Sequence, residues 1–127
     1  MKTTVFMIFL LYSLSMFSQE KSCTDFVTGT FKYDNVAYSD WIITRTATEQ
    51  IEINNATGLV IHNAVHWQSA CEFTLTCTKV SQDAYTQAIG AVFEIIISQT
   101  SKGNYTCIVK QNHIQANDMV FKMIKID

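Results

Sequence analysis

The sequence predicts an all-β domain, an antiparallel meander of about eight strands that forms a small barrel or a two-sheet sandwich. Apolar and polar residues alternate in one short segment after another, and turn residues separate these segments, which is typical of half-buried strands. After the leading segment, no apolar stripe with the helical period runs for a helical length. Because open sheet edges invite pairing with other chains, such a sheet must close or fold over.

The chain begins with a segment typical of a secretory signal peptide. One lysine precedes an apolar run, and small and polar residues follow it. The run has about 10 residues, whereas a membrane-spanning helix needs about 20. We predict that residues 1–18 are a signal peptide cleaved after Ser18, with Ser15 as the alternative position. The mature protein, residues 19–127, is expected to be exported to the periplasm or the cell exterior, with no transmembrane segment.

Length and charge limit the classes of function that the chain can have. The 127 residues leave room for one domain. Removing residues 1–18, which include one lysine, leaves 109 residues with 8 Lys and Arg against 11 Asp and Glu, a net charge of −3. This balance gives no electrostatic reason to expect a nucleic-acid partner or a polybasic membrane patch. We expect a monomer.

The predicted strands follow one another closely along the domain. They cover residues 27–33, 41–46, 49–54, 59–67, 71–80, 89–97, 105–110 and 114–126. The connection at 54–58 ends in glycine and is typical of a hairpin turn. The polar segment 81–88 has room for one helical turn, and His113 falls in a predicted turn.

Alternation assigns an inner face to each strand. In the strand at 49–54, Ile51 and Ile53 are expected to face inward, which places Gln50 and Glu52 outside. The strand at 89–97 is apolar on both faces except at Glu94, which is typical of a strand that is covered on both sides or lies centrally. Glu94 is therefore the one carboxylate expected to have apolar neighbours, unless it faces solvent.

Four cysteines, Cys23, Cys71, Cys77 and Cys107, allow three pairings if all are bonded. Cys71 and Cys77 cannot pair, because six residues of strand hold them about 20 Å apart, and the Cα atoms of a disulfide lie within about 7 Å. Cys77 and Cys107 lie in mid-strand on apolar faces, where a free cysteine serves as a small hydrophobe. Cys23 and Cys71 lie at element ends, where the geometry is adjustable, and we predict a disulfide between them.

The sequence offers no catalytic constellation. His62 and His66 would share a zinc ion on a helix, but on a strand they lie about 13 Å apart, on the face expected to meet solvent. No cysteines have the close spacing of a zinc site. No nucleophile elbow, P-loop or dinucleotide-binding fingerprint occurs, and the carboxylates are scattered singly. We therefore predict no enzyme activity, no catalytic residues, no metal and no cofactor.

A few polar groups among apolar ones are typical of a ligand pocket. Arg45 and Asn63 fall on inner faces, and Trp67, four residues after Asn63, lies on the same face as Asn63. A barrel of eight strands either fills with its own side chains or holds one small ligand. We expect a binding module for a small apolar ligand, with Arg45, Asn63 and Trp67 as its ligand-binding residues. The alternative is a filled β domain that acts as a secreted or envelope-associated protein-interaction module.

Five segments carry a family resemblance: TGTFKY, WIITR, GLVIHNAVHW, ACEFTLTCTKV and the terminal MIKID. Together they make the mature chain similar to a group of small secreted proteins of flavobacteria and related Bacteroidetes, which has no established function. Some members carry a DNA topoisomerase IV label, which does not fit an exported domain of 109 residues without a basic face. In architecture the meander also resembles lipocalins, although Trp41 follows Asp40 instead of the Gly-x-Trp pattern of that family. A carrier function is then implied by analogy alone.

Overall fold

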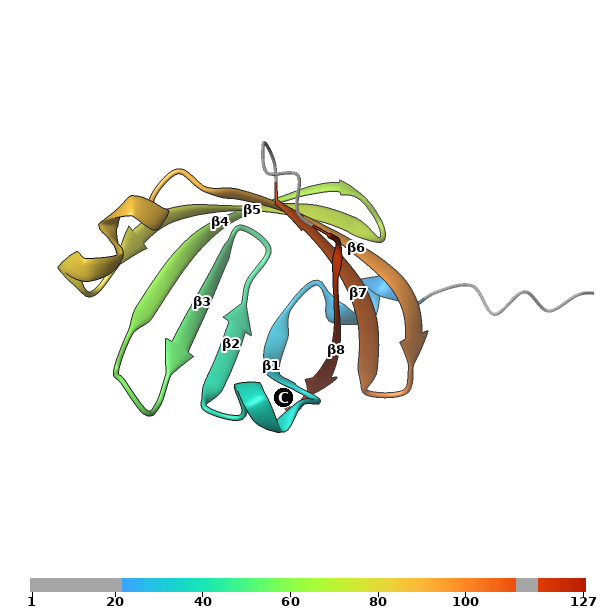
Figure 1. Cartoon of the computed structure of the whole chain (residues 1–127). Helices are drawn as coiled ribbons and strands as arrows, with labels where there is room; N and C mark the ends of the chain where they lie inside the picture. The colour runs from blue at the N-terminus through green and yellow to red at the C-terminus, as the bar shows by residue number, and fades with distance from the viewer. Residues whose placement is uncertain (1–21, 112–116) are drawn as a thin grey trace, which may run out of the picture.

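The protein is a closed antiparallel barrel of eight strands. The computed structural model describes residues 22–111 and 117–127. The strands follow one another around the barrel in chain order, and the last strand pairs with the first (Figure 1). The predicted meander is confirmed, and of the two architectures expected for it the barrel is the one observed. The predicted signal peptide at 1–18, His113 and the start of the predicted strand at 114–126 lie outside the described residues.

The bounds of the elements lie close to those expected from the sequence. The strands are β1 (Gly29–Tyr33), β2 (Trp41–Arg45), β3 (Glu49–Asn54), β4 (Val60–Ser69), β5 (Glu72–Val80), β6 (Val92–Ser101), β7 (Asn104–Gln111) and β8 (Met119–Lys125). In the described residues, three 3₁₀ helices accompany them: η1 (Cys23–Phe26), η2 (Val36–Tyr38) and η3 (Asp83–Ala88). β6 begins later than predicted, because Gly90 belongs to the preceding connection, where its φ of 91° favours glycine.

The two ends of the barrel differ in how the strands are joined. At one end the connections are the short segments 46–48, 70–71 and 102–103, and η1 leads into β1. We call this the closed end. At the other, open end lie η2, the connection 55–59 and η3. Figure 1 shows η1 in blue and η3 in gold on opposite sides of the molecule.

The helix η1 plugs the closed end. Its Phe26 is 2% exposed, and its ring centroid lies 5.0 Å from that of Tyr105 and 6.5 Å from that of Phe31. A disulfide joins Cys23, at the start of η1, to Cys71, just before β5. The predicted Cys23–Cys71 bridge is therefore confirmed, and it ties the plug to the barrel wall.

The inner face of β3 is the reverse of the predicted one. Gln50 is 3% exposed and Glu52 faces the interior, whereas Ile53 is 38% exposed on the outside. The register explains the reversal, because Gln50 pairs with Arg45 of β2, and residues directly opposite in a ladder share a face. Since Arg45 points inward, Gln50 and Glu52 must also point inward, and Ile51 is displaced to the outer face.

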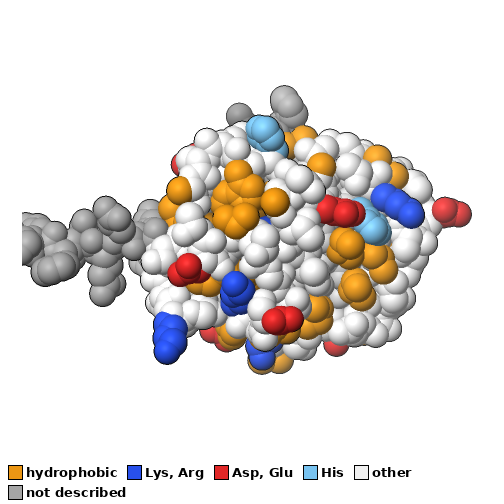
Figure 2. Space-filling view, turned by 180° about the vertical axis from the view of Figure 1, so that it is seen from behind, with side chains coloured by type: hydrophobic (Ala, Val, Ile, Leu, Met, Phe, Trp, Pro, Cys, Tyr) orange, Lys and Arg blue, Asp and Glu red, His pale blue; other side chains and the backbone are white. Residues whose placement is uncertain are grey.

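The outer surface mixes apolar groups with charges of both signs. Figure 2 shows one side of the molecule, on which Lys and Arg side chains and Asp and Glu side chains are scattered among separate hydrophobic groups. Glu94 lies on the outer face of β6, opposite Thr74 of β5 and Lys110 of β7. β6 lies between β5 and β7, as every strand of a closed barrel lies between two others. Within the described residues, no helix has the length and apolarity needed to cross a membrane.

Candidate binding cavity

The barrel encloses a cavity of about 420 Å³, a volume typical of small-molecule sites. It extends from Arg45 and Tyr105 at the closed end to Gln87 and Ala88 of η3 at the open end. Most of the wall is apolar; its apolar members include Ile43, Ile61, Phe73, Leu75, Phe93, Ile95, Val109, Phe121 and Met123. An interior space of this size distinguishes the barrel from one that its own side chains fill.

Arg45 forms the closed end of the cavity, with 3% of its surface exposed. Its Nε donates a hydrogen bond to Oε1 of Gln50, its Nη1 to the backbone carbonyl of Phe26, and its Nη2 to the hydroxyl of Tyr105. All three distances are 2.8 Å. Arg45 therefore links β2, β3 and β7 to the plug helix η1.

Two aromatic rings complete the surroundings of Arg45. Its guanidinium carbon lies 4.6 Å from the ring centroids of both Phe31 and Phe73, a distance at which a cation is attracted to the ring. Among the described residues, no carboxylate forms an ion pair with Arg45. Neutral acceptors and ring faces therefore compensate for the water that this buried charge has lost.

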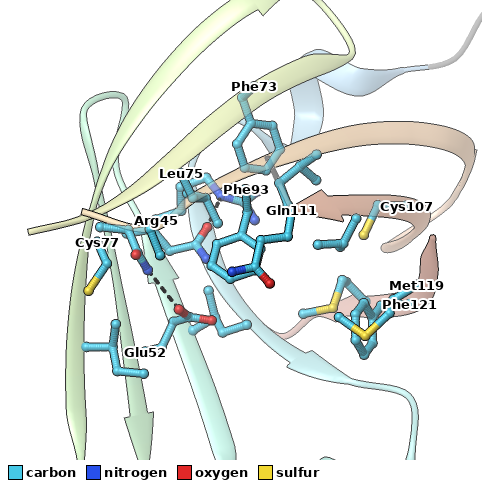
Figure 3. A pocket seen from close by; sticks show the side chains of 18 of the residues that line it. Arg45, Glu52, Phe73, Leu75, Cys77, Phe93, Cys107, Gln111, Met119 and Phe121 are labelled. Carbon is cyan, nitrogen blue, oxygen red and sulfur yellow. Dashed lines mark hydrogen bonds between the residues drawn. The ribbon is translucent and has the colours of Figure 1, made fainter. Parts of the chain in front are cut away.

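Glu52 and Asn63 form a second polar group on the cavity wall. Nδ2 of Asn63 donates a 2.7 Å hydrogen bond to Oε2 of Glu52 (Figure 3). Glu52 pairs with Ile61, two positions before Asn63 on β4, so Glu52 and Asn63 are diagonal neighbours on one face. Burial raises the pKa of Glu52 above its usual range, while the Asn63 hydrogen bond and the charge of Arg45 oppose this change.

The other titratable side chains that face the cavity stay uncharged near neutral pH. Burial, with a smaller contribution from the charge of Glu52, raises the pKa of Tyr33 above its usual range, and burial raises that of Tyr105. Cys77 and Cys107 are free and buried. Burial raises the pKa of Cys77 above its usual range and that of Cys107 to about 11, so both are thiols that serve as small hydrophobes.

The structure brings two of the three predicted ligand-binding residues to the cavity. Arg45 and Asn63 line it, as their predicted inner faces require. Trp67 also lies on the inner face of β4, but it packs on Phe73, with ring centroids 4.5 Å apart, outside the cavity wall. The sequence reasoning missed Glu52, although the pairing of β3 with a strand whose inward residue is Arg45 could have revealed it.

The two histidines of the sequence motif lie on the outside of the barrel. Nδ1 of His62 is 2.8 Å from Oε1 of Glu49, and His66 is exposed. Across residues 22–111 and 117–127, no three His, Cys, Asp or Glu side chains are grouped so that they could hold a metal ion. The cavity is therefore the candidate functional site of the described structure.

Fold and cavity together define the class of protein: a small, closed antiparallel barrel with a largely apolar interior space and a few buried polar groups. Comparisons with protein-family models, curated proteins and solved structures find no match to the chain. The function is therefore derived from the cavity itself.

Proposed function

We propose that the protein is an exported, non-catalytic binding protein that holds one small, largely apolar ligand inside its barrel. The observation that carries this proposal is the cavity of about 420 Å³ with its mostly apolar wall. Close packing is the rule in protein interiors, and unfilled space costs stability. A bound ligand would restore the missing contacts, which favours a ligand carrier over a filled domain that acts only by surface contact.

The open end supports the same function. Several elements at this end expose large apolar side chains: Val36, Tyr38, Tyr85, Ile89 and Met119. An apolar ligand that leaves water would meet these side chains before it enters the barrel, and the disulfide at the closed end suits an oxidising compartment outside the cytoplasm. Both features fit a lipocalin-like carrier.

A matched pair of tryptophan variants tests whether the cavity is the binding site. Val109 lines the cavity from β7, whereas Val120 on β8 is 64% exposed. Titration of the purified protein with Nile red, a neutral dye that fluoresces in apolar surroundings, should show saturable binding. Val109→Trp fills the cavity and should abolish this binding, while Val120→Trp should leave it unchanged. Equal binding by all three proteins would show that the dye sits elsewhere and would contradict the proposal.

Native mass spectrometry of protein isolated from its own host provides a second test. A ligand carrier should keep its ligand through purification and show a reproducible added mass, which the Val109→Trp variant should lack. A bare mass for the unaltered protein would count against a resident ligand.

A further inference from the structure

The proposed binding function leaves open which chemical class of ligand the cavity selects, and the two ionisable residues Arg45 and Glu52 of its wall differ in what they offer a ligand. Arg45 carries a permanent charge, but its Nε, Nη1 and Nη2 each already donate a hydrogen bond. Its guanidinium also lies over two rings, and the residue is 3% exposed. Arg45 is therefore committed to holding the plug, and a ligand meets little of it.

Glu52 is the carboxyl group among the described residues that line the cavity, and only one of its two oxygens has a hydrogen-bond partner there. Oε2 accepts the bond from Asn63, while Oε1 has no hydrogen bond within the described chain. Among described side chains, the one fully enclosed nitrogen or oxygen without a partner is Nε1 of Trp67. Oε1 of Glu52 is therefore not sealed into the wall, and because Glu52 lines the cavity, this oxygen faces its open space.

Asn63 adds a second oxygen beside Glu52 that has no hydrogen-bond partner among the described residues. Asn63 donates one amide hydrogen to Glu52. Like Oε1 of Glu52, Oδ1 of Asn63 is not fully enclosed and forms no hydrogen bond in the described part of the chain. A ligand head that donates several hydrogen bonds matches two such oxygens, and a protonated amine has three N–H groups when it is primary.

Aromatic rings surround the same space. Among the aromatic residues that line the cavity are Tyr33, Phe93 and Phe121. The rings of Tyr33 and Phe121 pack edge to face, with their centroids 5.4 Å apart. Ring faces attract organic cations, and a carboxylate beside aromatic rings is the chemistry that recognises ammonium groups. A carboxylate head would instead bring a second negative charge to Glu52, and like charges at close range repel.

We propose that the ligand is a cationic amphiphile, an alkyl or aryl amine whose apolar body fills the barrel and whose ammonium head binds Glu52 and Asn63. This inference rests on the proposed binding function. Glu52 is then the residue that determines specificity, and the ammonium head supplies the ion pair that Glu52 lacks among the described residues. A charge-assisted hydrogen bond in a dry site is worth about tenfold to a hundredfold in affinity.

Three ligands with the same chain and different heads test the proposal. Octylamine, octanol and octanoate are titrated into the Nile red complex of the mature protein near neutral pH, and displacement gives the three affinities. We expect octylamine to bind at least about tenfold more tightly than the other two. In Glu52→Gln, which keeps the size of the side chain and an oxygen for Asn63, octylamine should lose this advantage while octanol keeps its affinity. Glu94→Gln, on the outer face of β6, is the matched control and should bind all three as the unaltered protein does.

Each other outcome has a definite meaning. If octanoate binds most tightly, or octanol equals octylamine, the amine assignment is overturned and the binding function stands. If Glu52→Gln weakens all three ligands equally, Glu52 has a structural role and does not select the head group. If neither Nile red nor any of the three ligands binds, the proposed function itself fails. The comparison on the unaltered protein needs no variant, so poor folding of Glu52→Gln cannot leave the proposal untested.

Discussion

Removal of the disulfide should cost the protein about 4 kcal/mol of unfolding free energy. The bridge joins residues 48 positions apart, and in the chain-entropy model a closed loop of that size stabilises the native state by about 4 kcal/mol at room temperature. The double variant Cys23→Ala, Cys71→Ala removes the constraint and adds no polar group to the core. The hydrogen bond from Arg45 to Phe26 and the ring contacts of Phe26 remain, so we expect the variant to fold with η1 still docked.

Urea unfolding followed by tryptophan fluorescence measures this loss, because the chain has two tryptophans. The matched control is the unaltered protein after reduction, which breaks the same bond and keeps the sulfur atoms. Both samples should lose about 4 kcal/mol, a large share of the roughly 5–15 kcal/mol that stabilises a small domain. A loss below about 1 kcal/mol in both would refute the entropic reasoning. A much larger loss in the double variant alone would mean that packing around Cys23 contributes more than the bond.

Three further predictions concern the interior. Arg45→Lys keeps the charge, but a lysine cannot bond to Gln50, the Phe26 carbonyl and Tyr105 at once. The variant should therefore lose about 2–4 kcal/mol of unfolding free energy in urea titrations. An unchanged urea midpoint would contradict the linking role of Arg45. Burial raises the pKa of Glu52 above its ordinary 4.5, so the folded protein keeps a proton that the unfolded chain releases. The free energy of unfolding should therefore fall as the pH rises from 4.5 to the raised pKa of the folded state. Glu52→Gln should be more stable than the unaltered protein near neutral pH and lose this advantage in acid; the opposite slope would show that an ionised Glu52 stabilises the fold. With a pKa of about 11, Cys107 should resist iodoacetamide in the native protein and react on unfolding, as intact mass would show; labelling of Cys23 or Cys71 without reduction would disprove their bridge.

Local patterns in the sequence predict most of the barrel. Alternation places Phe73, Leu75 and Cys77 on one face of a strand, and the structure buries all three. For the disulfide, strand length excludes a bond between Cys71 and Cys77, and the choice of Cys23–Cys71 rests on the position of these two residues at element ends. The faces of this strand are predicted correctly because alternation depends only on neighbours in the chain.

The prediction failed at β3, where local pattern and ladder register disagree. Ile51 and Ile53 alternate with polar residues and are expected inside, yet the pairing of Arg45 with Gln50 turns the isoleucines outward. The inward position of Arg45 was itself predicted correctly, so one ladder contact would have corrected the neighbouring strand. The cavity could not be predicted in the same way, because its volume depends on how side chains from all eight strands pack.

The polar residues of the inner wall have two separate explanations. Arg45, Gln50 and Asn63 stand in one row across β2, β3 and β4, and Arg45 uses its bonds to Gln50 and Phe26 to hold the plug in place. Arg45 and Gln50 are therefore explained by their contribution to the stability of the closed end. It does not account for Glu52, whose bond to Asn63 would survive replacement of the carboxylate by an amide.

A buried carboxylate that lacks a cation destabilises the folded protein, and an aliphatic residue at the position of Glu52 would suit the apolar row formed with Ile43 and Ile61. The cost of keeping Glu52 there is explained if the ligand brings the cation that pairs directly with Glu52. On this reasoning Arg45, the first candidate for ligand recognition in the sequence, belongs to the architecture of the barrel. Glu52, which alternation placed outside, is the residue that gives the cavity its chemical selectivity.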